Sequence, residues 1–120
     1  METLCLIRDI YRSIREFEIH FQQEYDLCLN EGMLLCSLRK GNYSSSEIAE
    51  LLSLTNSNTS KVIKSVEDKG FVKRILGKED KRQMYFSLTE NGIKKLEEIK
   101  LKEGEMNSVL REIRKAFSVT

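Results

Sequence analysis

Apolar side chains recur every three or four positions in the first part of the chain. From about Leu4 to Gln22 this spacing predicts an amphipathic helix with arginines and glutamates on its other side. A second helix is expected from Glu31 to Lys40, with leucines facing inward and Gly41 ending it. The apolar positions of the first helix are Leu4, Ile7, Ile10, Tyr11, Ile14, Phe17 and Phe21.

Two shorter helices are expected next, joined by a tight turn. The run Ser44–Glu47 fits a capping box, in which a serine hydroxyl accepts from a free amide and Glu47 reaches back to the cap. The apolar positions that follow give a short helix, which residues 54–56 interrupt. A further helix then runs from about Ser57 to Lys69, and Gly70 suits a left-handed residue at its end. Together these two helices predict a helix-turn-helix unit.

After Gly70 the pattern changes to that of strands. Residues 71–76 are rich in strand formers, residues 84–89 alternate apolar with polar, and the polar segment 77–83 between them predicts a hairpin loop. A last long helix is expected from residue 90, with Gly104 as a place where it kinks or splits. Its apolar stripe consists of Ile93, Leu96, Ile99, Met106, Val109, Leu110, Ile113 and Phe117.

These elements predict one domain over residues 1–120, mainly α with a small β-hairpin. A winged helix-turn-helix lobe is expected at residues 31–89, because a charged hairpin directly behind a helix-turn-helix has the place of a wing. Long dimerisation helices are expected at residues 1–30 and 90–120.

The helix expected at 57–69 has two chemically different faces. Its core face carries Thr59, Val62, Ile63 and Val66. Short hydroxyl and amide side chains followed by lysines on the other face suit a helix that enters the major groove, where small groups reach base edges and lysines neutralise phosphates. The alternative is an ordinary solvated helix face. The candidate DNA contacts on this helix are Asn56, Ser57, Asn58, Ser60, Lys61 and Lys64.

The expected hairpin loop adds basic side chains at Lys78, Lys81 and Arg82. A guanidinium at a hairpin tip suits the negative potential of a minor groove. Asp80 stands two residues from Arg82 and is expected to order it; the alternative is a solubilising loop with a weak surface ion pair.

Positive charge is concentrated in the segment that contains this helix and the hairpin loop. The chain as a whole carries a net charge of only +1, but residues 53–82 hold eight basic and four acidic side chains, which leaves +4 there and −3 elsewhere. Basic density confined to the expected helix and wing indicates a nucleic-acid partner for that segment.

Other classes of protein find little support in the sequence. No catalytic pair of acids, nucleophile–base set or phosphate-binding glycine loop stands out, so neither an enzyme nor a cofactor is expected. His20 stands alone and predicts no metal site.

No apolar run approaches a membrane span, and the first residues do not resemble a secretory signal, so a cytoplasmic location is expected. Cys5, Cys28 and Cys36 suit a reducing compartment. We expect Cys28 and Cys36 in or near a core, and Cys5 is a candidate oxidant sensor.

The sequence resembles the MarR family of bacterial regulators. The similarity runs through Ser44–Ala49, Val66–Arg74, Asp80–Arg82 and Ser87–Gly92, the last of which contains a Leu-Thr-x-x-Gly motif. It implies an obligate homodimer that reads a palindromic operator, with Arg82 in the place of the family's minor-groove arginine and Asp80 in that of its wing aspartate. Two departures are the wing loop, which lacks the proline often found there, and a C-terminal region expected to be about one helix short.

The apolar stripes of the first and last helices favour contact between two chains, because a lobe of about 60 residues supplies its own core. An intramolecular core is the alternative. By the resemblance, a small apolar or anionic effector is expected where these helices join the lobe. The main hypothesis is a transcription factor on double-stranded DNA, and its rival is a winged helix that binds proteins. The dimerisation residues expected are Leu4, Ile7, Tyr11, Ile14, Phe17, Met106, Leu110, Ile113 and Phe117.

Overall fold

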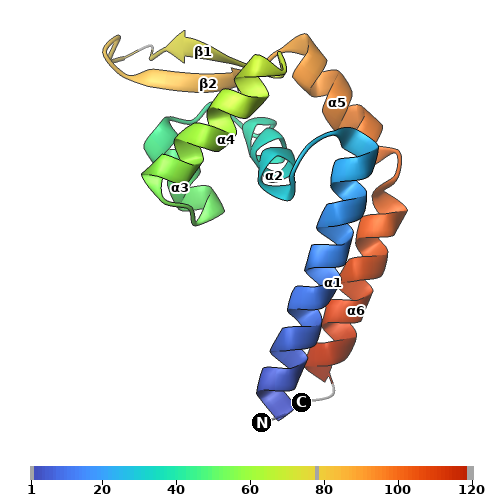
Figure 1. Ribbon diagram of the computed structural model, residues 1–120. Helices are drawn as coiled ribbons and strands as arrows, with labels where there is room; N and C mark the ends of the chain where they lie inside the picture. The colour runs from blue at the N-terminus through green and yellow to red at the C-terminus, as the bar shows by residue number, and fades with distance from the viewer. Residues whose placement is uncertain (1, 78, 119–120) are drawn as a thin grey trace. The chain divides into compact units, whose positions relative to one another are not determined.

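The structure is a computed structural model that describes residues 2–77 and 79–118, and in its last helix leaves out the side chains of residues 105 and 116–118. Figure 1 shows a mostly helical chain with one antiparallel hairpin, as the sequence predicts. The elements are α1 (Glu2–Tyr25), α2 (Leu29–Leu38), α3 (Ser45–Leu52), α4 (Asn56–Asp68), β1 (Val72–Leu76), β2 (Met84–Leu88), α5 (Glu90–Lys100) and α6 (Glu103–Ser118).

The chain forms two compact units, one of residues 1–28 with 99–120 and one of Leu29–Glu98. The second unit therefore includes most of α5, whereas the sequence placed the boundary at residue 89. Hydrogen bonds explain this difference, because the start of α5 is fixed to the segment between α4 and β1. Thr89 donates its backbone N–H to the carbonyl of Phe71 at 3.0 Å and its hydroxyl to the carbonyl of Gly70 at 2.6 Å.

In the first unit α1 and α6 run side by side in opposite directions (Figure 1). Aromatic rings line the end of α1: the centroids of Phe17 and Phe21 are 5.7 Å apart and those of Phe21 and Tyr25 are 4.9 Å apart. An ion pair joins Glu24 to Lys102. The first helix is longer than expected at both ends and stops where Asp26 takes a left-handed φ of 54°.

The C-terminal region is split, as Gly104 suggested, but at a different position and into two separate helices. The region contains α5 and α6, with a turn at residues 101–102 closed by the Lys102 N–H on the carbonyl of Ile99 at 3.1 Å. The break comes before Gly104, which lies inside α6. The sequence did not indicate a turn at residues 101–102, because Ile99 and Met106 are seven positions apart and the apolar spacing continues across it.

The second unit packs α2, α3 and α4 with the hairpin around one core. In β1 and β2 the register pairs Val72 with Leu88 and Leu76 with Met84. Beside the strands, the N–H of Phe86 bonds the carbonyl of Tyr43 at 2.9 Å, which attaches the hairpin to the segment before α3. The buried apolar side chains of this unit are Leu34, Leu35, Leu38, Ile48, Ala49, Ile63, Val66, Val72 and Phe86.

Local signals set the ends of the two short helices. The predicted capping box is present: the N–H of Glu47 bonds the Ser44 hydroxyl at 3.2 Å, and the Glu47 carboxylate accepts from the Ser44 N–H at 3.1 Å. Ser53 ends α3 with a left-handed φ of 54°, and Thr55 caps α4. Gly70 has the expected positive φ, 82°.

The exposure of the cysteines and the character of the helices can be compared with two predictions from the sequence. Cys36 is exposed, so its assignment to a core was wrong; it lies on the outer face of α2, and Cys28 is half-buried. Of the helices in the described part of the chain, none has the length and apolar character that crossing a membrane requires.

Candidate nucleic-acid interface

The first turns of α4 present the polar face that the sequence predicts. Thr59 is fully buried, Ile63 and Val66 are buried and Val62 is half-buried, so the opposite side of the helix is left to solvent. Because the Thr55 hydroxyl accepts from the N–H of Asn58 at 3.1 Å, the start of this helix is fixed. All six candidate side chains of α4 are exposed: Asn56, Ser57, Asn58, Ser60, Lys61 and Lys64.

Two of these side chains have partners within the helix. The Ser60 hydroxyl donates to the carbonyl of Asn56 at 3.0 Å, which leaves its oxygen able to accept from a base edge. The Lys64 ammonium lies 3.7 Å from the carboxylate of Asp68, and both side chains are exposed. Such a surface pair is worth little, so Lys64 can exchange it for a phosphate at small cost.

The wing places Arg82 at the tip of a tight turn. The N–H of Gln83 bonds the carbonyl of Asp80 at 3.0 Å, which puts Lys81 and Arg82 at the two central positions of that turn. The carboxylate of Asp80 accepts from the backbone N–H of Arg82 at 3.0 Å and from its Nε at 3.3 Å. With 93% of the Arg82 side chain exposed, the guanidinium is oriented but open to a ligand. Lys78 lies outside the described residues.

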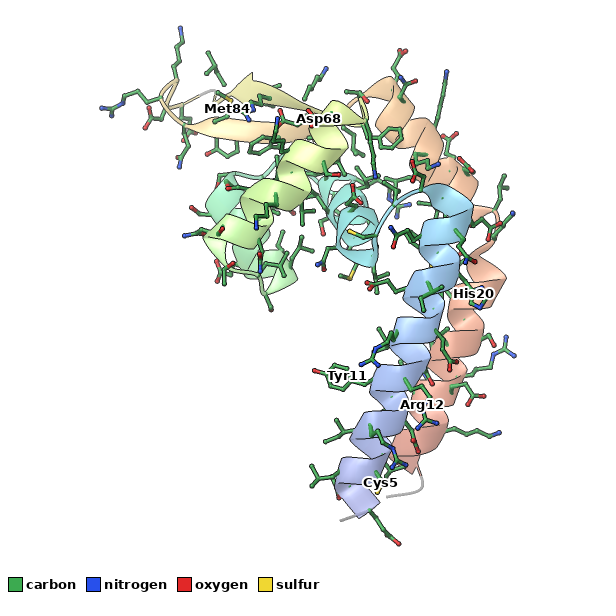
Figure 2. The ribbon with its side chains drawn as sticks, viewed as in Figure 1. Cys5, Tyr11, Arg12, His20, Asp68 and Met84 are labelled. Carbon is green, nitrogen blue, oxygen red and sulfur yellow. The ribbon has the colours of Figure 1, made fainter. Side chains whose placement is uncertain are left out.

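The wing and the start of α3 share one hollow of about 530 Å³. It is lined by the capping serines Ser44–Ser46 and, from the wing, by Asp80, Arg82, Gln83 and Met84, the last of which is labelled in Figure 2. The N-terminus of a helix carries partial positive charge, and Arg82 adds a full one. These two groups favour an anion such as a backbone phosphate, while the Asp80 carboxylate in the same lining, paired with Arg82, offsets part of their charge.

A buried carboxylate that the sequence analysis did not single out holds the other end of α4. Glu31 of α2 is only 5% exposed. It accepts from the Ser65 hydroxyl at 2.8 Å and from the Lys69 ammonium at 3.1 and 3.3 Å. These bonds satisfy the buried charge and fix the C-terminal half of α4 on α2.

A second such contact joins α4 to the wing. Glu67 accepts from Nε of Arg74 at 2.8 Å and from its Nη2 at 3.1 Å, in a two-pronged pair. The hydrogen bond first, and then the charge of Glu67, raise the pKa of Arg74 above its usual value. The guanidinium also lies 5.8 Å from the ring centroid of Phe86, its partner across the hairpin.

The Leu-Thr-x-x-Gly motif is explained by the junction between β2 and α5. The Thr89 hydroxyl accepts from the N–H of Gly92 at 3.1 Å while it donates to the carbonyl of Gly70. A Cβ on Gly92 would overlap the carbonyl oxygen of Phe71 and lie 3.1 Å from its carbon. The motif therefore allows the close approach that fixes the base of the wing.

In the first unit the expected dimerisation residues fall into two groups. Leu4, Ile7, Tyr11 and Ile14 are exposed and follow helical spacing, and Tyr11 projects from α1 on the side away from α6 (Figure 2). Leu110 of α6 is 49% exposed. The half-buried residues are Phe17, Met106 and Ile113, and the side chain of Phe117 lies outside the described ones.

A groove of about 660 Å³ runs between α1 and α6. His20 lines it together with glutamates and the apolar Phe17 and Val109. Among the described residues, no group of three or more histidine, cysteine or acidic side chains is arranged to hold a metal ion.

Comparison with known proteins agrees with this geometry. The MarR family model matches residues 29–84. An uncharacterized HTH-type transcriptional regulator of Bacillus subtilis, YwaE, is 27% identical over 104 residues, which cover 82% of this chain and 61% of the relative. The chain thus spans less than two thirds of the length of that relative.

Two solved structures have the same fold. MepR of S. aureus in complex with DNA has a TM-score of 0.74 at 25% identity, covering 88% of this chain and 79% of that one. The transcriptional regulator BldR of Sulfolobus solfataricus has a TM-score of 0.75 at 24% identity, covering 98% of this chain and 94% of that one.

Proposed function

We propose that this chain is a MarR-family transcriptional regulator that binds double-stranded DNA through α4 and the wing; the MarR family model matches residues 29–84, and the relative YwaE is described as an HTH-type transcriptional regulator. The observation that carries this proposal is a polar, fully exposed helix start beside a hairpin whose tip arginine is held by Asp80. The similarity to MepR, which was solved bound to DNA, supports it. The proposed contacts are Asn56, Ser57, Asn58, Ser60, Lys61, Lys64, Lys78, Lys81 and Arg82.

The two parts of the site have different roles in this proposal. Small polar side chains such as Ser57 read base edges in the major groove, while Lys61 and Lys64 neutralise phosphates. Arg82 enters the adjacent minor groove, where guanidinium loses less on desolvation than ammonium does. Asp80 reduces the conformational freedom that Arg82 loses on binding.

The protein acts as a homodimer in this proposal. Leu4, Ile7, Tyr11 and Ile14 form a stripe on α1 with large exposed fractions, 65% for Tyr11. Covering such a stripe with a second copy removes apolar surface from water. Two-fold symmetry then places two recognition helices on half-sites about 34 Å apart, and the operator is an inverted repeat.

Regulation by a small molecule completes the proposal, with the bacterial cytoplasm as the place of action. A ligand changes operator affinity only if it binds the DNA-competent and incompetent states with different affinity. Titration of candidate ligands against the operator complex measures this difference directly.

Selection of bound fragments from a random duplex library tests the DNA-binding proposal. We expect an inverted repeat, and we expect affinity that falls steeply with salt because phosphates supply much of the binding. Arg82→Ala should weaken operator binding about 5- to 150-fold per wing and leave folding intact. Absence of any selected sequence, or equal operator affinity of Arg82→Ala and wild type, would favour a winged helix that binds protein instead.

A further inference from the structure

Three bodies must keep fixed positions if α4 and the wing are to meet two grooves together: α4, the hairpin and the helices under them. Hydrogen bonds from Thr89 hold the base of the hairpin, beside Gly70 and Phe71. The tip, with Arg82, is at the far end. Between base and tip, an ion pair links the hairpin to α4. It joins Arg74 of β1 to Glu67 of α4.

We propose that Glu67 and Arg74 act as a clamp that sets the position of the wing relative to the recognition helix, so that the minor-groove contact of Arg82 depends on them. This inference rests on the proposed DNA-binding function. Neither residue needs to touch DNA in it; both are positioning residues.

The geometry of the pair suits a clamp better than a simple surface ion pair. Two nitrogens of Arg74 bond two oxygens of Glu67, at 2.8 and 3.1 Å, which fixes orientation as well as distance. The Glu67 side chain is only 20% exposed, so water competes less for it than for an open carboxylate. Single-pronged, open pairs such as Lys64 with Asp68 give no comparable restraint.

The contacts of Arg74 extend across both strands. It pairs in register with Phe86, and its guanidinium lies over that ring. Phe86 is buried and its N–H bonds the carbonyl of Tyr43, ahead of α3. A shift of Arg74 therefore moves the middle of the hairpin relative to both helices of the helix-turn-helix.

A different role for Arg74 makes the opposite prediction. Its side chain is 58% exposed, so it is also placed to contact a phosphate directly. If that were its role, removing the charge of Glu67 would release Arg74 and lower repulsion, and DNA affinity would rise. If the pair is a clamp, the same change lowers operator affinity.

The test uses Glu67→Gln in the full chain, with Asp68→Asn as matched control. Asp68 (Figure 2) is the next residue, carries the same charge, and its ion pair stays within α4. Operator affinity is measured by fluorescence anisotropy. We expect at least about a 5-fold loss for Glu67→Gln and no loss for Asp68→Asn. Arg74→Lys, which keeps the charge without the two-pronged bond, should fall between wild type and Glu67→Gln.

A double-mutant cycle separates positioning from stability. In wild type, Arg82→Ala should cost about 5- to 150-fold; in Glu67→Gln it should cost less than about 3-fold, because a misplaced wing has little contact to lose. Hydroxyl-radical footprints should show the minor-groove protection by the wing weakened in Glu67→Gln, with protection by α4 retained. Urea unfolding confirms that the variants are folded.

The outcomes are distinct. The same cost of Arg82→Ala in both backgrounds, or tighter binding by Glu67→Gln, overturns the clamp while DNA binding through the wing stands. No effect of Arg82→Ala in wild type overturns the wing contact and the clamp with it.

Discussion

Gly92→Ala tests the junction between the wing and α5. The structure allows an estimate of how much this substitution lowers the free energy of unfolding. The new Cβ would overlap the carbonyl oxygen of Phe71, a backbone atom that cannot rotate away. Overpacking of this kind costs about 1–3 kcal/mol. The same shift breaks the 3.0 Å bond from the Thr89 N–H to that carbonyl, which contributes about 1 kcal/mol. Helix propensity favours alanine by about 1 kcal/mol, so the free energy of unfolding should fall by about 1–3 kcal/mol.

Gly104→Ala is the matched control, because nothing lies within 4 Å of a Cβ at that helical position. It should leave the free energy of unfolding unchanged or raise it by up to about 1 kcal/mol. Both variants are measured by urea unfolding followed by circular dichroism. Equal stability of Gly92→Ala and wild type would refute the close approach at the junction and the explanation given for the motif.

The other predictions concern the DNA contacts, the dimer and a helix cap. Lys64→Ala should weaken binding to all duplexes alike and reduce the salt slope by about one unit, whereas Ser57→Ala should change the sequences recovered by selection; uniform losses for Ser57→Ala would remove it from base reading. In sedimentation velocity at micromolar concentration we expect wild type to be dimeric and Ile7→Asp to be monomeric; an unchanged mass would contradict the α1 interface. Thr55→Ala should lower the free energy of unfolding by about 1 kcal/mol in urea, and no change would argue against its role as the cap of α4.

Local signals predicted much of the fold. The capping box at Ser44, the left-handed Gly70 and the core face of α4 were all readable, because each depends on neighbours within a few positions. The contact of Asp80 with Arg82 was predictable for the same reason, since they are only two positions apart in the chain.

Contacts between different helices and strands could not be predicted from the sequence. Glu67 and Arg74 stand on either side of a helix end, where no periodicity relates one position to the other. Glu31 looked like an ordinary acidic residue in a first turn, and only the fold shows it buried against Ser65. The sequence placed the split of the last helix at Gly104 rather than at residues 101–102, because the apolar repeat continues across the turn and nothing in composition marks it.

The pairing of α1 with α6 has a consequence for how the chain folds. The two helices come from opposite ends of the described sequence, and all of Leu29–Glu98 lies between them. Contacts between distant parts of a chain form late, because the entropy of closing a long loop is lost before the contact gains anything. Folding of the intervening residues brings the ends of that loop closer and reduces this loss. During synthesis α1 is made well before α6, so the contacts between the two helices form only after the residues between them have been made.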